Sequence, residues 1–163
     1  MAHFDVVASK RFRGQLDLNN GSIAGFVKLT ATKAIPEGDS GKSILVGPAA
    51  DGLGANATAT LPAAKDGLFF KFIYAGNAAD AQNFLIDTGS DTNFFIGGLA
   101  HYDSAADDTN GIPDLVFGDG DSNSVLTITT PTAGTVVECY CDGTNWFLSG
   151  NVVSATAPSF ADQ

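Results

Sequence analysis

The sequence is built from short runs of apolar and β-branched residues that are separated by turn residues. Between residues 22 and 152, clusters of Gly, Pro, Asn and Asp recur roughly every 8–12 residues, a spacing typical of β-sandwiches and barrels. No segment of about ten or more residues has the 3.6-residue apolar period of an amphipathic helix. The sequence therefore predicts an all-β protein, an antiparallel β-sandwich or jelly-roll-like domain of about ten short strands with terminal arms. The predicted strands are 22–30, 43–46, 56–61, 68–74, 83–88, 92–96, 114–117, 124–129, 135–141 and 146–152.

The length of 163 residues and 16.7 kDa fits one domain with one core. We expect the sandwich to span residues 21–154, preceded by an N-terminal arm or first strand at 1–20 and followed by a C-terminal tail at 155–163. No apolar run approaches the roughly 18 residues that cross a bilayer, so no membrane partner is expected. The first residues also lack the apolar stretch and cleavage site of a secretory signal.

The charges are divided unevenly along the chain. All eight Lys and Arg lie at or before Lys71, where six acidic residues leave a net charge of +2. Residues 72–163 carry twelve acidic residues and no basic one, and the whole chain has a net charge of −10. An acidic surface repels phosphate backbones, so no nucleic-acid partner is expected. This uneven charge distribution suits a molecule that has one end docked on a partner and the other end facing solvent. The alternative is that the acidic residues serve only to keep the protein soluble.

Two motifs resemble protease active sites, and we interpret both as turns. The segment 38–41 (GDSG) matches the nucleophile box of trypsin-like enzymes, whose chemistry needs a His base, but the one His before it is His3. Asp87-Thr88-Gly89 matches the loop of aspartic proteases, in which two carboxylates share a proton, and a homodimer would supply the second. An Asp-Thr-Gly turn that ends a strand is the competing interpretation of Asp87. We expect no enzymatic activity.

The stretch 101–124 is the most acidic part of the chain. Within it Asp119, Asp121 and Asn123 place oxygen ligands at i, i+2 and i+4, as calcium-binding loops do. The loop departs from the EF-hand pattern, which has Gly and Glu where this chain has Ser124 and Thr130. The two interpretations are a calcium or sodium site without helices and a solvated acidic loop. No other cofactor is expected.

The hairpin that closes the sandwich carries both cysteines and the one Trp. Cys139 and Cys141 share a face if 135–141 is a strand, and a bridge between them would close a strained ring. Two thiols are also too few for a structural zinc, so we expect both to be reduced and packed. Trp146 follows an Asp-Gly turn and is expected to cap the core with its N–H reaching the rim. Stacking on a sugar ring is the alternative.

Three stretches together resemble one kind of protein. They are a Leu-Thr-Ala strand followed by Asp39-Ser40-Gly41-Lys42 within 26–46, the segment 59–73 (ATLPAAKDGLFFKFI), and the hairpin 142–150 that opens with Asp-Gly-Thr-Asn-Trp. In that order they are similar to small structural proteins of tailed bacteriophages, above all capsid decoration (cement) proteins of marine and cyanobacterial phages. The resemblance implies an all-β homotrimer that is made in the host cytoplasm and binds the major capsid protein on the outer surface of the virion, without catalysis.

The N-terminal arm is the segment that we expect to dock on the capsid. It joins apolar side chains to a basic group, a composition suited to an acidic shell, and strand addition would supply main-chain hydrogen bonds. An ordinary first strand is the alternative. The expected function is to staple neighbouring capsomers; the alternative is a receptor- or glycan-binding module of a phage fibre or tail, with an exposed aromatic platform at Tyr102 or Trp146. The predicted docking residues are Phe4, Val6, Val7, Lys10, Arg11, Phe12 and Arg13.

Overall fold

The computed structural model describes residues 26–105 and 112–163. The arm at 1–20 lies outside the described residues. All its predicted docking residues lie there with it, namely Phe4, Val6, Val7, Lys10, Arg11, Phe12 and Arg13. Among residues 26–105 and 112–163, no helix has the length and apolar character needed to span a bilayer.

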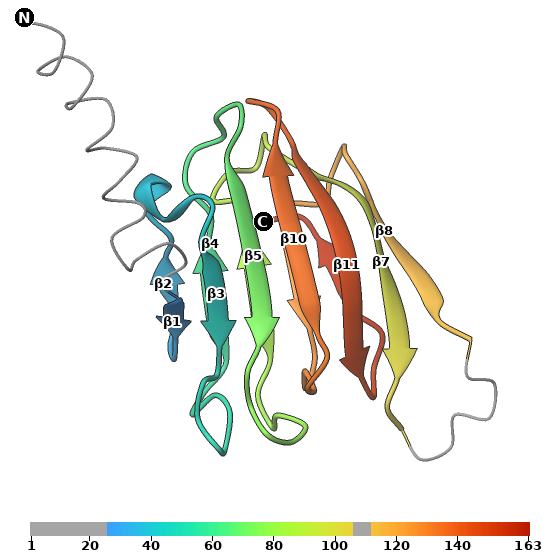
Figure 1. The fold of residues 1–163 in the computed structure, drawn as a ribbon. Coiled ribbons are helices and arrows are strands. Elements are labelled where there is room, and N and C mark those ends of the chain that lie inside the picture. Colours follow the sequence, from blue (N-terminus) through green and yellow to red (C-terminus); the bar gives the residue numbers. More distant parts are fainter. Residues whose placement is uncertain (1–25, 106–111) are drawn as a thin grey trace, which may run out of the picture.

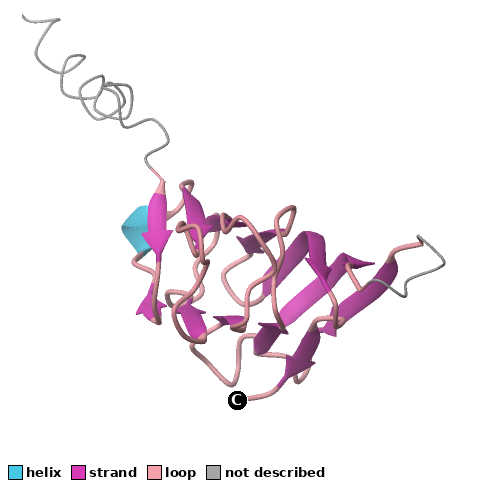
Figure 2. Ribbon diagram, turned by 90° about the horizontal axis from the view of Figure 1, so that it is seen from below, coloured by secondary structure: helices cyan, strands magenta, loops and turns pink. Residues whose placement is uncertain are grey.

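The described residues form two β-sheets that pack face to face, which confirms the prediction of an all-β sandwich. In Figure 1 the larger sheet runs from β1 to β8, and Figure 2 shows the short 3-10 helix η1 (Glu37–Asp39) at one side. The seven-stranded sheet has the order β1 (Val27–Leu29), β3 (Ser43–Val46), β5 (Phe69–Tyr74), β10 (Val136–Cys141), β11 (Trp146–Ser154), β7 (Phe95–Asp103) and β8 (Asp114–Asp119). The five-stranded sheet has the order β12 (Ser159–Ala161), β9 (Val125–Ile128), β6 (Phe84–Asp87), β4 (Ala57–Thr60) and β2 (Lys33–Ala34).

Both sheets are mixed, which differs from the antiparallel sandwich that the sequence predicts. The strands pair in parallel at β1–β3, β3–β5, β2–β4, β4–β6 and β7–β11. From β1 to β7 successive strands alternate between the two sheets. Each strand therefore runs parallel to the previous strand of its own sheet. Crossing to the facing layer supplies the long connection that parallel neighbours require.

The space between the sheets is filled by the inward-facing residues of alternating strands. In β5, Phe70, Phe72 and Tyr74 are buried, whereas the residues between them are only half-buried. The Phe72 ring meets that of Phe84 from the opposite sheet, with 5.6 Å between ring centroids. Burying each such side chain stabilises the fold by about 1.5–3 kcal/mol, so this row joins the two layers.

The segment from residue 139 onward places Trp146 and both cysteines in the core and adds a strand to the smaller sheet. Trp146 is fully buried, which confirms its place in the core, but its Nε1 is also buried and has no hydrogen-bond partner among the described residues. The expectation that this N–H reaches the rim was therefore wrong. Both cysteines are free and buried, as expected, and burial raises the pKa of the Cys139 thiol. The predicted tail at 155–163 contains β12, which pairs with β9.

Candidate functional site

An aromatic row crosses the outer face of the seven-stranded sheet. The register places Tyr140 of β10 between Phe69 of β5 and Phe147 of β11, and Phe147 beside Ile96 of β7. Phe69 and Tyr140 stack with 4.7 Å between ring centroids and 24° between ring planes. Tyr140 is 44% exposed and Phe147 is 40% exposed. We call Phe69, Tyr140, Phe147 and Ile96 the aromatic row.

An ion pair flanks the aromatic row and leaves little free charge beside it. Lys71 Nζ lies 3.0 Å from Glu138 Oε1, and the Tyr140 hydroxyl donates a hydrogen bond to Glu138 Oε2 at 2.9 Å. The hydrogen bond from Lys71, and then that from Tyr140, lower the pKa of Glu138, while the bond to Glu138 raises the pKa of Tyr140. The three side chains are hydrogen-bonded or ion-paired to one another, so a partner that covered this part of the sheet would not bury an unpaired charge.

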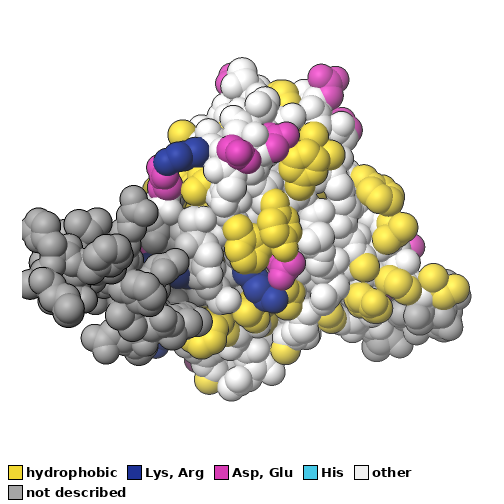
Figure 3. All heavy atoms as spheres, turned by 45° about the horizontal axis from the view of Figure 1, so that its top comes forward, with side chains coloured by type: hydrophobic (Ala, Val, Ile, Leu, Met, Phe, Trp, Pro, Cys, Tyr) yellow, Lys and Arg dark blue, Asp and Glu magenta, His cyan; other side chains and the backbone are white. Residues whose placement is uncertain are grey.

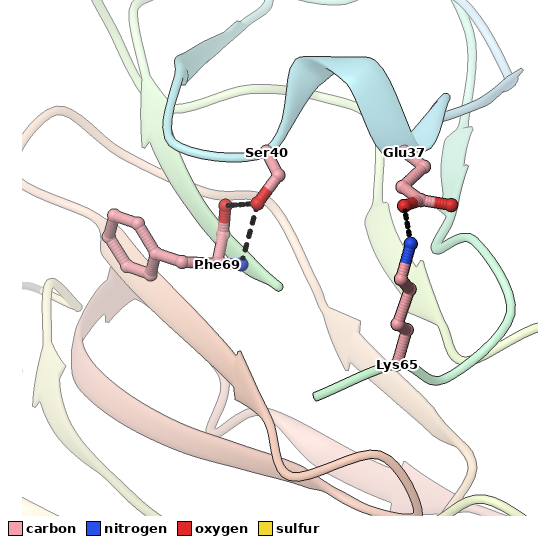
Figure 4. Close-up of polar contacts among 4 residues, drawn as sticks. All are labelled: Glu37, Ser40, Lys65 and Phe69. Carbon is pink, nitrogen blue, oxygen red and sulfur yellow. Dashed lines mark hydrogen bonds and ion pairs between the residues drawn. The ribbon is translucent and has the colours of Figure 1, made fainter. Parts of the chain in front are cut away.

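Residues 38–41 (GDSG) form hydrogen bonds with the backbone of Phe69, the first residue of the aromatic row (Figure 4). The Ser40 hydroxyl accepts a hydrogen bond from Phe69 N–H at 3.0 Å and lies 3.4 Å from Phe69 O as a donor. The N–H of Gly41 donates to the same carbonyl at 2.8 Å, and Lys65 pairs with Glu37 across the loop. Ser40 is thus engaged with the backbone of β5, in line with the interpretation of this motif as a loop.

A second apolar group lies on the same face, where β7 meets β8. Phe117 is 62% exposed and pairs with Gly98, and its ring lies so close that a Cβ at Gly98 would be 2.6 Å from it. Leu115 is 65% exposed and pairs with Ala100. Hydrophobic side chains gather over this face in Figure 3. Exposed apolar residues thus occur both in the aromatic row and at the β7–β8 edge of this sheet.

The outer face of the five-stranded sheet has a different composition. Its β4 and β9 present the half-buried hydroxyl residues Thr58, Thr60 and Thr127, and β6 presents Leu85 and Asp87. Leu85 pairs with Thr58 on one side and Thr127 on the other. The two outer faces of one sandwich therefore differ, and the aromatic side chains are on the seven-stranded side.

The predicted metal loop is closed by its own hydrogen bonds. Asp119 Oδ1 accepts from the N–H groups of Asp121 and Ser122 at 3.0 and 3.2 Å, and Asn123 Oδ1 accepts from Asp119 N–H at 3.0 Å. The bond from Asp121, and then that from Ser122, lower the pKa of Asp119. In the part of the chain that is described, no three His, Cys, Asp or Glu residues are grouped to hold a metal ion. The stretch 101–124 is also not a single loop, because it contains the end of β7 and the whole of β8.

The aspartic-protease motif also forms a local turn. Asp87 Oδ1 accepts from Gly89 N–H at 2.7 Å and from the Gln163 side-chain amide, and the Thr88 hydroxyl donates to Ser90 O at 2.7 Å. The bond from Gly89 N–H to Asp87 Oδ1 is that of an Asx turn. Asp87 is held at the end of β6, against the last residue of the chain.

Sequence reasoning did not find the aromatic row, and of its two alternatives for a glycan platform one residue is exposed and the other is buried. Tyr102 is exposed on β7, as that alternative expected, whereas Trp146 is buried. A usable signal was present in the closing hairpin: pairing Cys141 with Trp146 across the turn necessarily places Tyr140 opposite Phe147. Nothing comparable connects Phe69 and Ile96 to them. The chain matches no protein-family profile, no curated protein and no solved structure.

Proposed function

We propose that the chain is a non-enzymatic structural protein of a virion, which binds the major capsid protein on the outer surface of a phage capsid and staples neighbouring capsomers. The phage assignment rests on the sequence resemblance. The observation that carries the docking role is the asymmetry of the sandwich. Tyr140 and Phe147 of the aromatic row are exposed on the seven-stranded sheet, whereas the outer face of the five-stranded sheet carries half-buried threonines beside Leu85 and Val125. Tyr and Phe are enriched and charged residues depleted at the centres of protein interfaces, and the aromatic row has this composition.

The rest of the molecule supports the same proposal. Residues 72–163 carry twelve acidic residues and no basic one, which keeps the undocked surfaces soluble and repels like particles. The described body consists of two hydrogen-bonded sheets packed on one core, so docking through it requires little ordering of the backbone. Several modest contacts that engage neighbouring capsomers together give firm attachment through effective concentration.

Cosedimentation of the purified protein with purified phage heads tests the proposal. We expect saturable binding, weakened at least about tenfold by the double substitution Tyr140→Ser and Phe147→Ser, since buried aromatic anchors dominate interface energies. The matched control is Leu85→Ser, which truncates an apolar side chain on the opposite outer face and should leave binding unchanged. Absence of saturable binding by the unaltered protein would contradict the proposal.

A second variant separates the arm from the body. Protein that starts at Gln15 lacks the basic docking residues that the sequence predicts. Loss of head binding in this variant, with binding retained by the Tyr140 and Phe147 double variant, places the dock in residues 1–14. The reverse pattern places it on the aromatic row. Either result supports a capsid-binding role.

A glycan-binding module of a fibre or tail is the second candidate function. The observation that favours it is the stacked pair of Phe69 and Tyr140 next to exposed Phe147, because flat aromatic surfaces bind sugar rings. A glycan array and titration calorimetry distinguish the two candidates. Glycan binding that is lost in the Tyr140 and Phe147 double variant, together with no binding to heads, would select this function.

A further inference from the structure

Strand β8 forms one edge of the seven-stranded sheet. Among the described residues it pairs with β7 and with no strand on its other side. Its two outward-facing apolar side chains, Leu115 and Phe117, are 65% and 62% exposed. Lys residues commonly protect such edges, but no Lys or Arg occurs after Lys71 in this chain. Among residues 26–105 and 112–163, no strand pairs with this edge, and its exposed apolar side chains lie between the carboxylates of Asp114 and Asp119.

The hydrogen-bond pattern shows which backbone groups of β8 face the open edge. Gly120 N–H donates to Phe95 O at 2.9 Å, in line with the unbroken register from Asp119 opposite Ile96 to Asp114 opposite His101. In an antiparallel pair, every second residue bonds to the partner and the residues between point away. Residues 114, 116 and 118 therefore bond to β7, and the N–H and C=O groups of Leu115 and Phe117 point to the open edge.

At both ends of this open edge, the next backbone N–H is either already bonded or missing. The backbone N–H of Asp119 also faces the open edge, but it already donates a hydrogen bond to Asn123 Oδ1 at 3.0 Å. Pro113, which precedes the strand, has no N–H to donate. The N–H donors of β8 that face the open edge are thus those of Leu115 and Phe117, and these two donors favour one register of an added strand.

We propose that the occupant of this edge is the β8 strand of a second copy of the chain, in an antiparallel pair about a two-fold axis at Val116. In this register Leu115 exchanges two hydrogen bonds with the Phe117 of the second copy, and the symmetry repeats that pair. A shift of one residue would place the exposed face of one copy against the buried face of the other. A shift of two would place Pro113 opposite Phe117, or Asp119 opposite Leu115, and lose hydrogen bonds.

Charge and packing agree with the same register. Asp114 faces Gly118 of the second copy instead of a carboxylate, so no like charges lie directly opposite each other. The side chains of Leu115 and Phe117 lie on one face and pack against each other across the axis. The two larger sheets join into one, and both aromatic rows lie on the same side of the dimer. The inference does not depend on the proposed capsid role, and it departs from the homotrimer that the sequence resemblance implies.

Sedimentation equilibrium of the full chain over a range of concentrations tests the inference. We expect a dimer of twice the 16.7 kDa chain mass. Phe117→Asp, with unchanged far-ultraviolet circular dichroism, should weaken the dimer at least about tenfold because it brings a charge to Leu115 of the second copy. A monomer at all concentrations, a trimer as the resemblance implies, or a dimer unaffected by Phe117→Asp each overturns the inference.

A cross-link tests the register without depending on a disruptive substitution. Val116 and its symmetry mate form the pair without main-chain hydrogen bonds, in which Cα atoms are about 4.5 Å apart, within the range of a disulfide. We expect Val116→Cys to form a disulfide-linked dimer on mild oxidation, while the native Cys139 and Cys141 stay buried. Tyr102→Cys, exposed on the neighbouring β7, is the matched control and should stay uncross-linked. Equal cross-linking of the two variants, or none at Val116→Cys, overturns the register.

Discussion

At the scale of single residues, the carboxylate of Asp80 joins three segments of the chain. Its Oδ2 accepts from Leu53 N–H at 2.8 Å and from the Tyr74 hydroxyl at 3.1 Å, and its Oδ1 accepts from Gln82 N–H at 3.0 Å. The side chain is buried, so each donor would lose its partner without gaining water. Two loops next to β5 thus depend on one acidic group.

Replacing Asp80 should therefore cost much more than replacing an exposed aspartate. We expect Asp80→Ala to lower the free energy of unfolding by about 3 kcal/mol, because it leaves buried donors unsatisfied. Asp91→Ala, at an exposed turn position, should change it by less than about 0.5 kcal/mol. Urea denaturation of both variants measures the difference, and equal effects would show that Asp80 has no special role.

The same contact makes stability depend on alkaline pH. Burial, and then the charge of Asp80, raise the pKa of Tyr74 from 10.0 to about 12. Folding thus favours the protonated phenol: its contribution is fully present below pH 10, where the unfolded tyrosine titrates, and is lost as the pH rises toward 12. We expect the free energy of unfolding to fall across this window.

The Tyr74→Phe variant is the control for that prediction. It should be less stable than the unaltered protein at pH 8 by about 1 kcal/mol, because the hydrogen bond to Asp80 is missing. The gap between the two proteins should close as the pH approaches 12. Denaturation at several pH values measures it, and a gap that stays constant would show that Tyr74 does not titrate in this way.

At the scale of elements, the sequence predicts most of the strands but not how they pair, and its strand at 92–96 is wrong because the structure has β7 at Phe95–Asp103. Alternation of apolar residues is local, so segments such as 43–46 and 69–74 are found close to their predicted bounds. Strand β2 has two exposed residues and β12 has three residues that are exposed or half-buried, so neither has an apolar period to recognise. Turn residues between strands suggest hairpins, whereas this chain uses many of those turns to cross to the facing sheet.

The aromatic row shows the same limit at the candidate site. Tyr140 and Phe147 flank one turn, and their pairing follows from the hairpin. Phe69 and Ile96 join them through β5–β10 and β7–β11, contacts between strands far apart in sequence. Which face of a strand looks outward depends on register, and register between distant strands is set by the whole fold.

The backbones of β10 and β11, two strands of the aromatic row, approach each other closely at Gly150, which predicts that a side chain there would destabilise the fold. Gly150 has φ +134°, and a Cβ there would be 2.2 Å from Val136 O on the neighbouring strand. We expect Gly150→Ala to destabilise the protein by about 3 kcal/mol or to prevent folding, since both the backbone conformation and the space exclude a side chain.

Gly38→Ala is the matched control for Gly150→Ala. A Cβ at Gly38 meets nothing within 4 Å, and its backbone needs no positive φ. Thermal unfolding of the two variants should show a large fall in Tm for the first and almost none for the second. Similar Tm values would mean that β10 and β11 can separate to admit the methyl group.

At the scale of the whole molecule, the buried thiol in β10 reports on global opening. β10 is the middle strand of the seven-stranded sheet, and Cys139 faces the core. In a Cys141→Ser variant, where Cys139 is the one remaining thiol, we expect labelling by a thiol reagent to be at least about a thousandfold slower than for an exposed cysteine. Rapid labelling without unfolding would contradict a single cooperative core.

The strand order also bears on how the chain is made. The centre of the larger sheet needs β10 between β5 and β11, and β7 reaches β11 but not β5, so the middle cannot close before residues 136–154 exist. Those residues follow β1 to β9 in the sequence, and folds dominated by such distant pairings form slowly. In the first half of the chain β1, β3 and β5 can already pair with one another, as can β2, β4 and β6. The second edge of β5 has no partner until β10 is made, so this apolar strand stays uncovered on one side during that interval.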